Sequence, residues 1–201
     1  LESGGSLITA GTILNSGAFN AQRSISNAQW HLISSPVSNA LSGMFIGDYL
    51  QNWSEEDALW YEIVETDISL VPAKGFGLWA NGSGSGTHIF TGTPNSGMQS
   101  IELTTAGSGG DYNRANLLGN PYSSSIDWDG LDETWGAVYI WNPDFDNGNG
   151  TFGKYISWVD GIGTNGGNQY IVPMQGFFMV AEIDDGGSDI ILNNDNRTHI
   201  G

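Results

Sequence analysis

The sequence predicts an all-β protein with a β-sandwich-type architecture, built from two homologous repeats. Thirty glycines and eighteen asparagines, with only 13% charged residues, disfavour long helices and suit tight turns. Eight Trp, seven Tyr and eight Phe supply the apolar side chains that pack between sheets. Short apolar runs recur at intervals of about ten residues between turn signals, which is typical of sandwiches.

An internal repeat is the second basis of the prediction. Residues 32–36 are echoed by residues 117–121, and residues 70–80 return as residues 171–181. The first pair is offset by 85 positions and the second by 101, so the later copy carries about 16 extra residues. We expect residues present in both copies to be scaffold, and residues present in only one copy to be better candidates for function.

The first repeat is expected at residues 30–105, where strands alternate with turns. Apolar residues between positions 44 and 53 are spaced as in a short helix. The elements expected here are a strand at 30–34, that helix, strands at 59–64 and 75–80, and a hairpin of 87–92 with 100–104.

The second repeat is expected at residues 112–200, with the two repeats packed as one unit. Its strand at 137–141 is taken as the equivalent of residues 60–63. The strand at 155–159 and the Gly/Asn-rich loop at 160–168 have no clear counterpart in the first copy. Strands near 116–118, 176–181 and 189–192 complete it.

Residues 1–28 differ from the rest of the chain in the spacing of their apolar residues. Short apolar pairs alternate with Gly, Ser and Asn, as in the rungs of a β-solenoid. This segment is expected to be either solenoid-like or an edge strand of the main body. At most one or two short helices are expected in the whole chain.

Charge and cysteine content exclude several classes of function. Five basic against 22 acidic residues give a net charge of −17, which excludes nucleic acid as a partner because nothing neutralises phosphate. The absence of cysteine excludes disulfides, thiolate catalysis and Cys-ligated zinc. No run of 18 apolar residues is present, so no membrane insertion is expected.

Four segments together carry a family resemblance. Residues 30–36, 90–97, 116–128 and 173–178 resemble a region that recurs in large secreted proteins of Bacteroidota with a type IX secretion C-terminal sorting domain. The segment from Asn116 to Tyr122 is the most specific part. The resemblance implies a secreted or cell-surface location, with neighbouring domains of the same polypeptide as partners. It implies no established activity.

One loop has the composition of a calcium site. Alternating Asp and Asn with intervening Gly can wrap several oxygens around a Ca²⁺ ion. An EF-hand would place Glu where Tyr155 stands, and the alternative is a plain Asn-Gly hairpin turn. The candidate ligands are Asn142, Asp144, Asp146, Asn147 and Asn149.

Aromatic residues in polar surroundings indicate carbohydrate binding. A flat ring matches the C–H face of a sugar, while neighbouring polar groups bond its hydroxyls. The candidates are Trp53, Trp128, Trp135, Tyr155 and Trp158, with Asp127 and Asp129 as polar neighbours. Trp30, Trp60, Trp79 and Trp141 lie in apolar strand patterns and are expected in the core.

These observations favour a non-catalytic extracellular module that binds polysaccharide, with Ca²⁺ rigidifying the binding face. A structural spacer or adhesion domain is the first alternative. A glycan-active hydrolase or lyase is the second, because residues 55–57 and 127–133 contain carboxylate groups. No nucleophile elbow or metal-type histidine spacing is present, so no catalytic residue is assigned.

Overall fold

The computed structural model describes residues 1–8, 18–81, 86–107, 112–132 and 135–200. Within these ranges the all-β prediction is confirmed, since the described helices are single 3₁₀ turns. None of them has the length and apolar character needed to cross a membrane. The four turns are η1 (Ser42–Phe45), η2 (Trp128–Gly130), η3 (Ile183–Asp185) and η4 (Asn194–Asn196).

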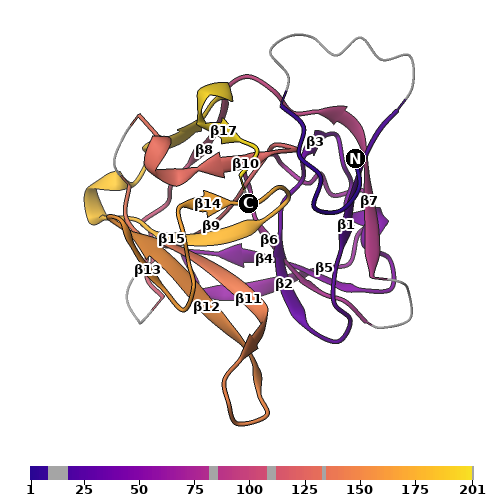
Figure 1. Cartoon of the computed structure of the whole chain (residues 1–201), viewed down its shortest axis with the longest axis horizontal. Helices are drawn as coiled ribbons and strands as arrows, with labels where there is room; N and C mark the ends of the chain where they lie inside the picture. The colour runs from indigo at the N-terminus through magenta and orange to yellow at the C-terminus, as the bar shows by residue number, and fades with distance from the viewer. Residues whose placement is uncertain (9–17, 82–85, 108–111, 133–134, 201) are drawn as a thin grey trace.

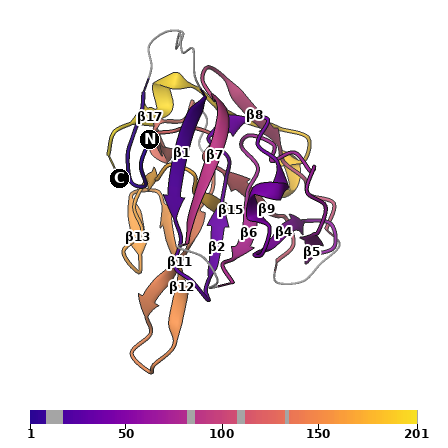
Figure 2. The ribbon, with the colours of Figure 1, turned by 90° about the vertical axis from the view of Figure 1, so that its right-hand side faces the viewer.

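The first unit combines a four-stranded sheet with a three-stranded one. The order of the larger sheet is β2-β6-β4-β5 and that of the smaller is β1-β7-β3, all antiparallel. Figure 2 shows β1 and β7 side by side as two long paired strands. The strands are β1 (Phe19–Ser24), β2 (Trp30–Ile33), β3 (Val37–Ser38), β4 (Tyr49–Ser54), β5 (Leu59–Ile63), β6 (Phe76–Trp79) and β7 (Thr87–Pro94).

The second unit repeats this pairing order. Its largest sheet runs β9-β15-β11-β12, as β2-β6-β4-β5 does, and β13 extends it. β16 pairs with β8 and β17 with β10, as β7 pairs with both β1 and β3. The strands are β8 (Gln99–Glu102), β9 (Ala115–Gly119), β10 (Ser125–Asp127), β11 (Val138–Asp146), β12 (Phe152–Val159), β13 (Ile162–Thr164), β14 (Tyr170–Ile171), β15 (Gly176–Val180), β16 (Asp189–Leu192) and β17 (Arg197–Thr198).

The structure corrects three expectations about these elements. Residues 49–53, expected to end a helix, form β4, because their aromatic side chains pair across to β5 and only η1 is helical. The expected hairpin of β7 with β8 is absent: β7 pairs with β1, and β8 pairs with β16 of the second unit. β11 corresponds by pairing order to β4 and not to β5.

The N-terminal segment contributes an edge strand. β1 lies at the outer edge of the β1-β7-β3 sheet, so the edge-strand alternative holds for residues 19–24. Much of the segment expected to be solenoid-like, residues 9–17, lies outside the described residues. The β11–β12 hairpin, the main extra feature of the second unit, projects from the body at the bottom of Figure 1.

The two units cross at a pair of equivalent turns. Ala73 and Met174 each follow a proline and have left-handed φ values of 62° and 61°. The Ala73 carbonyl accepts from Gly119 N at 2.8 Å, and the Met174 carbonyl accepts from Ser34 N at 3.0 Å. Each turn therefore hydrogen-bonds to the strand end of the other unit.

Side chains are exchanged at this crossing. Met174 of the second unit packs in the hydrophobic core of the first, with Ile33, Leu78 and Phe90. Ala73 of the first unit packs in the core of the second. A third cluster fills the space between the units and includes Leu32, Ala115, Leu117 and Phe178. The two units therefore share one continuous body.

Close backbone approach at the crossing requires glycine. A Cβ added to Gly75 would lie 2.3 Å from the Leu118 carbonyl oxygen, and one added to Gly176 would lie 2.8 Å from that of Ile33. Backbone atoms on the partner strand cannot move aside as a flexible side chain can. Even the smallest side chain would therefore separate the two units.

We predict that Gly75→Ala lowers the free energy of unfolding by about 1–3 kcal/mol, as overpacking of a close contact does. The control is Gly136→Ala, because the nearest atom to a Cβ there is 3.6 Å away. Urea denaturation of the two variants measures the difference. Equal stabilities would contradict the assignment of Gly75 to a close inter-unit contact.

Candidate functional site: an aromatic pocket between the units

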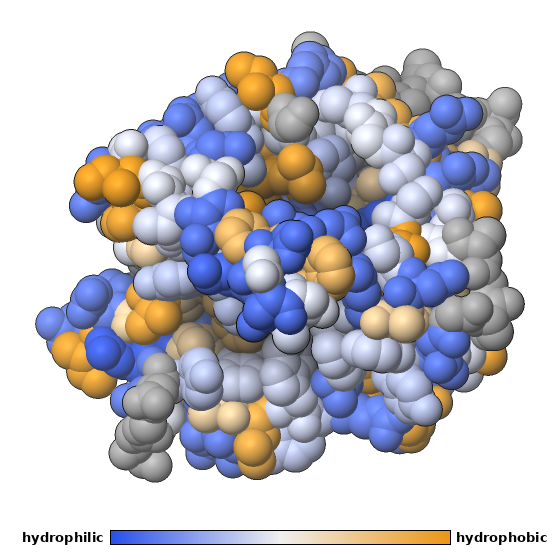
Figure 3. Space-filling model, turned by 60° about the horizontal axis from the view of Figure 1, so that its bottom comes forward, coloured by the Kyte–Doolittle hydropathy of each residue, from blue (hydrophilic) through white to orange (hydrophobic). Residues whose placement is uncertain are grey.

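An aromatic pocket opens where the larger sheets of the two units face each other. Its volume is about 560 Å³, in the range of small-molecule sites. Figure 3 shows the lower face of the molecule, where hydrophobic residues are dispersed among polar ones and the surface is hollowed near its centre. The residues that line the pocket are Trp53, Ala58, Trp60, Tyr112, Ala115, Tyr139, Tyr155, Phe178 and Val180.

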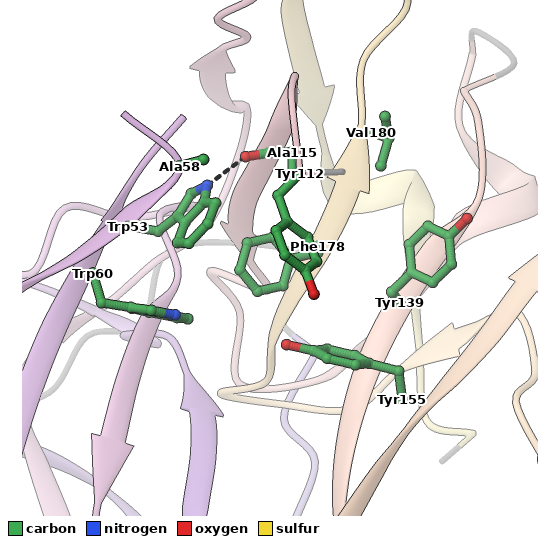
Figure 4. A pocket seen from close by; sticks show the side chains of 9 residues that line it. All are labelled: Trp53, Ala58, Trp60, Tyr112, Ala115, Tyr139, Tyr155, Phe178 and Val180. Carbon is green, nitrogen blue, oxygen red and sulfur yellow. Dashed lines mark hydrogen bonds between the residues drawn. The ribbon is translucent and has the colours of Figure 1, made fainter. Parts of the chain in front are cut away.

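The first unit supplies two tryptophans from one hairpin. Trp53 on β4 stands directly opposite Trp60 on β5, and their rings meet edge to face at 5.3 Å. Trp53 Nε1 donates a 2.6 Å hydrogen bond to the Ala115 carbonyl of the second unit. This bond, drawn in Figure 4, fixes the indole ring across the boundary between the units.

The second unit supplies the opposite wall from β11 and β12. Tyr155 on β12 stands opposite Trp141 on β11, with ring centroids 5.1 Å apart. The pairing order makes this pair the equivalent of Trp53 and Trp60. Both members of the first pair line the pocket, and Tyr155 of the corresponding second pair lines it from the other side.

Phe178 forms the floor between the two walls. It is 9% exposed, and its ring lies 5.4 Å from that of Trp53, 5.9 Å from Trp60 and 6.2 Å from Tyr155. The interplanar angles are 88°, 84° and 72°, so the rings stand nearly perpendicular to the floor. In the first unit Gly77 takes the corresponding position, beneath the Trp60 ring.

The polar groups of the pocket are tyrosine hydroxyls. In Figure 4 the hydroxyls of Tyr112 and Tyr155 point into the space between the walls, whereas that of Tyr139 points away. Burial raises the pKa of Tyr155 to about 12, with a smaller contribution from Tyr112. The Tyr155 hydroxyl is therefore protonated at neutral pH and can donate as well as accept a hydrogen bond.

A buried carboxylate holds the segment that carries Tyr112. Glu55, 5% exposed, follows β4 and accepts hydrogen bonds from three backbone N–H groups, at 2.9–3.0 Å. The donors are Ala106, Gly107 and Arg114 in the connection between the units. Glu55, considered from the sequence only as part of a carboxylate group, thus ties the first unit to the segment that carries Tyr112.

The structure brings only two of the predicted carbohydrate-binding residues into the pocket. Trp53 and Tyr155 line it, and Trp60, expected in the core, lines it with them. Trp30, also expected in the core, is 38% exposed. The contributions of Tyr112, Tyr139 and Phe178 were missed, because their convergence depends on how the two units pack.

The other predicted aromatics lie around η2. Trp128 was expected in polar surroundings but is 5% exposed: it packs on Phe177 at 5.5 Å and donates to the Gly136 carbonyl. Trp135 is half-buried against the same core. Trp158 Nε1 donates to Asp129 Oδ1 at 2.8 Å. The exposed-platform hypothesis is therefore wrong for Trp128.

The two aspartates near Trp128 also have local structural partners. Asp127 accepts from the backbone N–H of Asp129 and from the side chain of Gln169. The Asp129 carboxylate is bonded to Trp158. The arrangement holds η2 against β12, and none of these residues lines the aromatic pocket.

The predicted calcium ligands lie on the projecting hairpin. Asn142, Asp144 and Asp146 belong to β11, while Asn147 and Asn149 lie in the turn that follows it. The Oδ1 atoms of Asn142, Asp146 and Asn149 each accept a backbone hydrogen bond two residues on. Among the described residues, no three His, Asp or Glu side chains gather as a metal group.

The fold and the site define a class: an all-β protein of two topologically equivalent units with an aromatic pocket at their junction. The chain belongs to a family described as a domain of unknown function, DUF8693, whose profile matches residues 1–200. No curated protein and no solved structure matches the chain. The family description assigns no activity.

Replacing Glu55 tests whether its carboxylate anchors the connecting segment that carries Tyr112. We expect Glu55→Ala to lower the free energy of unfolding by at least about 1–3 kcal/mol, because buried N–H groups lose their acceptor. The exposed neighbour Glu56 is the control, since a surface change there is expected to stay within about 0.5 kcal/mol. Urea midpoints compare Glu55→Ala with Glu56→Ala; similar values would show that Glu55 is not an anchor.

Proposed function

We propose that this protein is a non-catalytic extracellular module that binds carbohydrate in the aromatic pocket. The observation that carries the proposal is the convergence of Trp53, Trp60, Tyr155 and Phe178 on one open cavity. Exposed apolar surface is unfavourable in water, and a concave aromatic surface on a soluble protein indicates a ligand.

Carbohydrate is the ligand class that fits both the apolar and the polar parts of the pocket. The C–H face of a sugar ring packs on aromatic rings, and its hydroxyls need donors and acceptors at the edge. The rings of Trp60 and Phe178 offer surfaces on which a sugar ring can pack. The Tyr112 and Tyr155 hydroxyls offer hydrogen-bond donors and acceptors (Figure 4). A purely apolar ligand would leave the Tyr112 and Tyr155 hydroxyls without a hydrogen-bond partner from the ligand.

Binding without turnover is favoured over glycan hydrolysis. Glycosidases need two carboxyl groups on either side of the bond that is cut. None of the nine residues that line the pocket carries a carboxylate, and the nearby Glu55 is occupied by backbone donors. A spacer or adhesion domain of a large secreted protein remains the alternative, and it needs no open pocket.

Removal of the pocket rings tests the proposal. We expect Trp60→Ala and Tyr155→Ala to weaken binding of a neutral polysaccharide at least about tenfold, equivalent to about 1.4 kcal/mol. A glycan array identifies the polysaccharide, and titration calorimetry measures each affinity. Circular dichroism and the melting temperature check that each variant is folded.

The controls are Trp30→Ala and Trp158→Ala, since neither residue lines the pocket. Both are expected to retain the affinity of the unmodified protein. If Trp158→Ala removed binding while Trp60→Ala did not, the site would lie near η2 and not between the units. If the protein binds no polysaccharide on the array, the spacer alternative is favoured.

Calcium at the projecting hairpin is a separate prediction. If Asp144 and Asp146 hold Ca²⁺, excess calcium raises the melting temperature, because an ion that binds only the folded state stabilises it. The double variant Asp144→Asn/Asp146→Asn should lose this rise. An unchanged melting temperature in excess calcium would discard the ion without affecting the carbohydrate proposal.

A further inference from the structure

Acidic residues adjoin the pocket lining in sequence, and none of the lining residues is basic. The chain carries 22 acidic against five basic residues, and none of the five lines the pocket. Glu56 and Asp57 lie in the turn that also contributes Ala58 to the pocket wall. Glu182, two residues beyond Val180, is paired with Arg114, so its charge is largely offset. A ligand that approaches the pocket therefore meets a negative potential.

The two basic residues closest in sequence to the pocket each contact another side chain and do not line it. Arg114 precedes Ala115, but its guanidinium lies 3.7 Å from the Glu182 carboxylate. Lys154 precedes Tyr155 on β12, so its side chain leaves from the opposite face of the strand. Its ammonium group lies 5.2 Å from the centre of the Phe145 ring on the projecting hairpin.

Two further cations serve to hold the two units and the chain ends in place. Arg23 donates to the Met174 carbonyl and to Gln175 Oε1 at the crossing of the units. Arg197 donates to the Leu7 carbonyl and to Ser124 Oγ, and its guanidinium lies over the Tyr122 ring. These contacts occupy both guanidinium groups away from the pocket.

We infer that the pocket selects neutral glycans and rejects glycans that carry carboxylate or sulfate groups. The inference rests on the proposed function and names its ligand class. An acidic sugar would lose hydration in the pocket without gaining a counter-charge, and the surrounding carboxylates would repel it. A neutral sugar has no ionic charge to desolvate, is not repelled, and keeps its contacts with the Trp53, Trp60 and Phe178 rings.

A matched pair of ligands tests the inference on the unmodified protein. The neutral polysaccharide that binds best in the array is oxidised at its primary hydroxyls, so that the same backbone carries carboxylates. We expect the oxidised form to bind at least about tenfold more weakly at 0.01 M salt, where the Debye length is about 30 Å. This gap should narrow several-fold at 1 M salt, where that length is about 3 Å.

A charge placed at the pocket separates the local potential from the net charge. Val180 lines the pocket and is 40% exposed, so Val180→Lys adds a cation at its wall. Ile89, 49% exposed on β7, lies outside the pocket, and Ile89→Lys changes the net charge equally. We expect Val180→Lys to improve binding of the oxidised form at least about fivefold, and Ile89→Lys to leave it nearly unchanged. Ala58→Lys serves as a second variant if Val180→Lys does not fold.

The outcomes distinguish this inference from the proposal on which it rests. Oxidised and neutral forms that bind equally would overturn the selectivity and leave carbohydrate binding intact. If 1 M salt does not reduce the difference in affinity between the two forms, and Val180→Lys does not strengthen binding of the oxidised form, the difference is steric. That result would also overturn the selectivity. If no neutral polysaccharide binds at all, the proposed function itself fails.

Discussion

The reciprocal crossing of two equivalent turns is the constraint on which the rest of the structure depends. Ala73 and Met174 adopt the same left-handed conformation, bond to the opposite unit and pack in the opposite core. Neither unit completes its core without a side chain from the other. Gly75 and Gly176 permit this approach because a Cβ on either would meet partner backbone. The repeats therefore fold as one body, and the distance between their larger sheets is fixed.

The aromatic pocket follows from that distance. Once the crossing sets the two larger sheets face to face, the cross-strand pair of Trp53 and Trp60 stands opposite Tyr155, with Phe178 between them. Bonds from Trp53 to Ala115 and from Glu55 to the connecting segment tie the walls together. The pocket proposed to bind ligand and the joining of the units thus use the same surfaces.

The most specific segment of the family resemblance has a structural explanation. The side-chain amide of Asn120, fully buried, donates to the carbonyls of Ser124, Ile171 and Val172. The Tyr122 hydroxyl donates to the carbonyls of Gly97 and Leu192. These bonds fasten the turn after β9 to β14 and β16. The segment therefore stabilises the fold of the second unit, and none of its residues lines the aromatic pocket.

Composition, turn signals and the internal echo were enough to predict an all-β chain with a repeated pattern, because glycine turns and alternating apolar residues act locally. Strand partners were not predictable in the same way: β8 joins the second unit, and the longer β11–β12 hairpin hides the equivalence of Trp60 and Tyr155. The polar neighbours of Trp128 in the sequence also led to a wrong prediction of its exposure, because Trp128 packs on Phe177 in the core. The residue types of the pocket were thus determined by sequence alone. Their convergence was decided by tertiary structure, because it depends on contacts between residues more than a hundred positions apart.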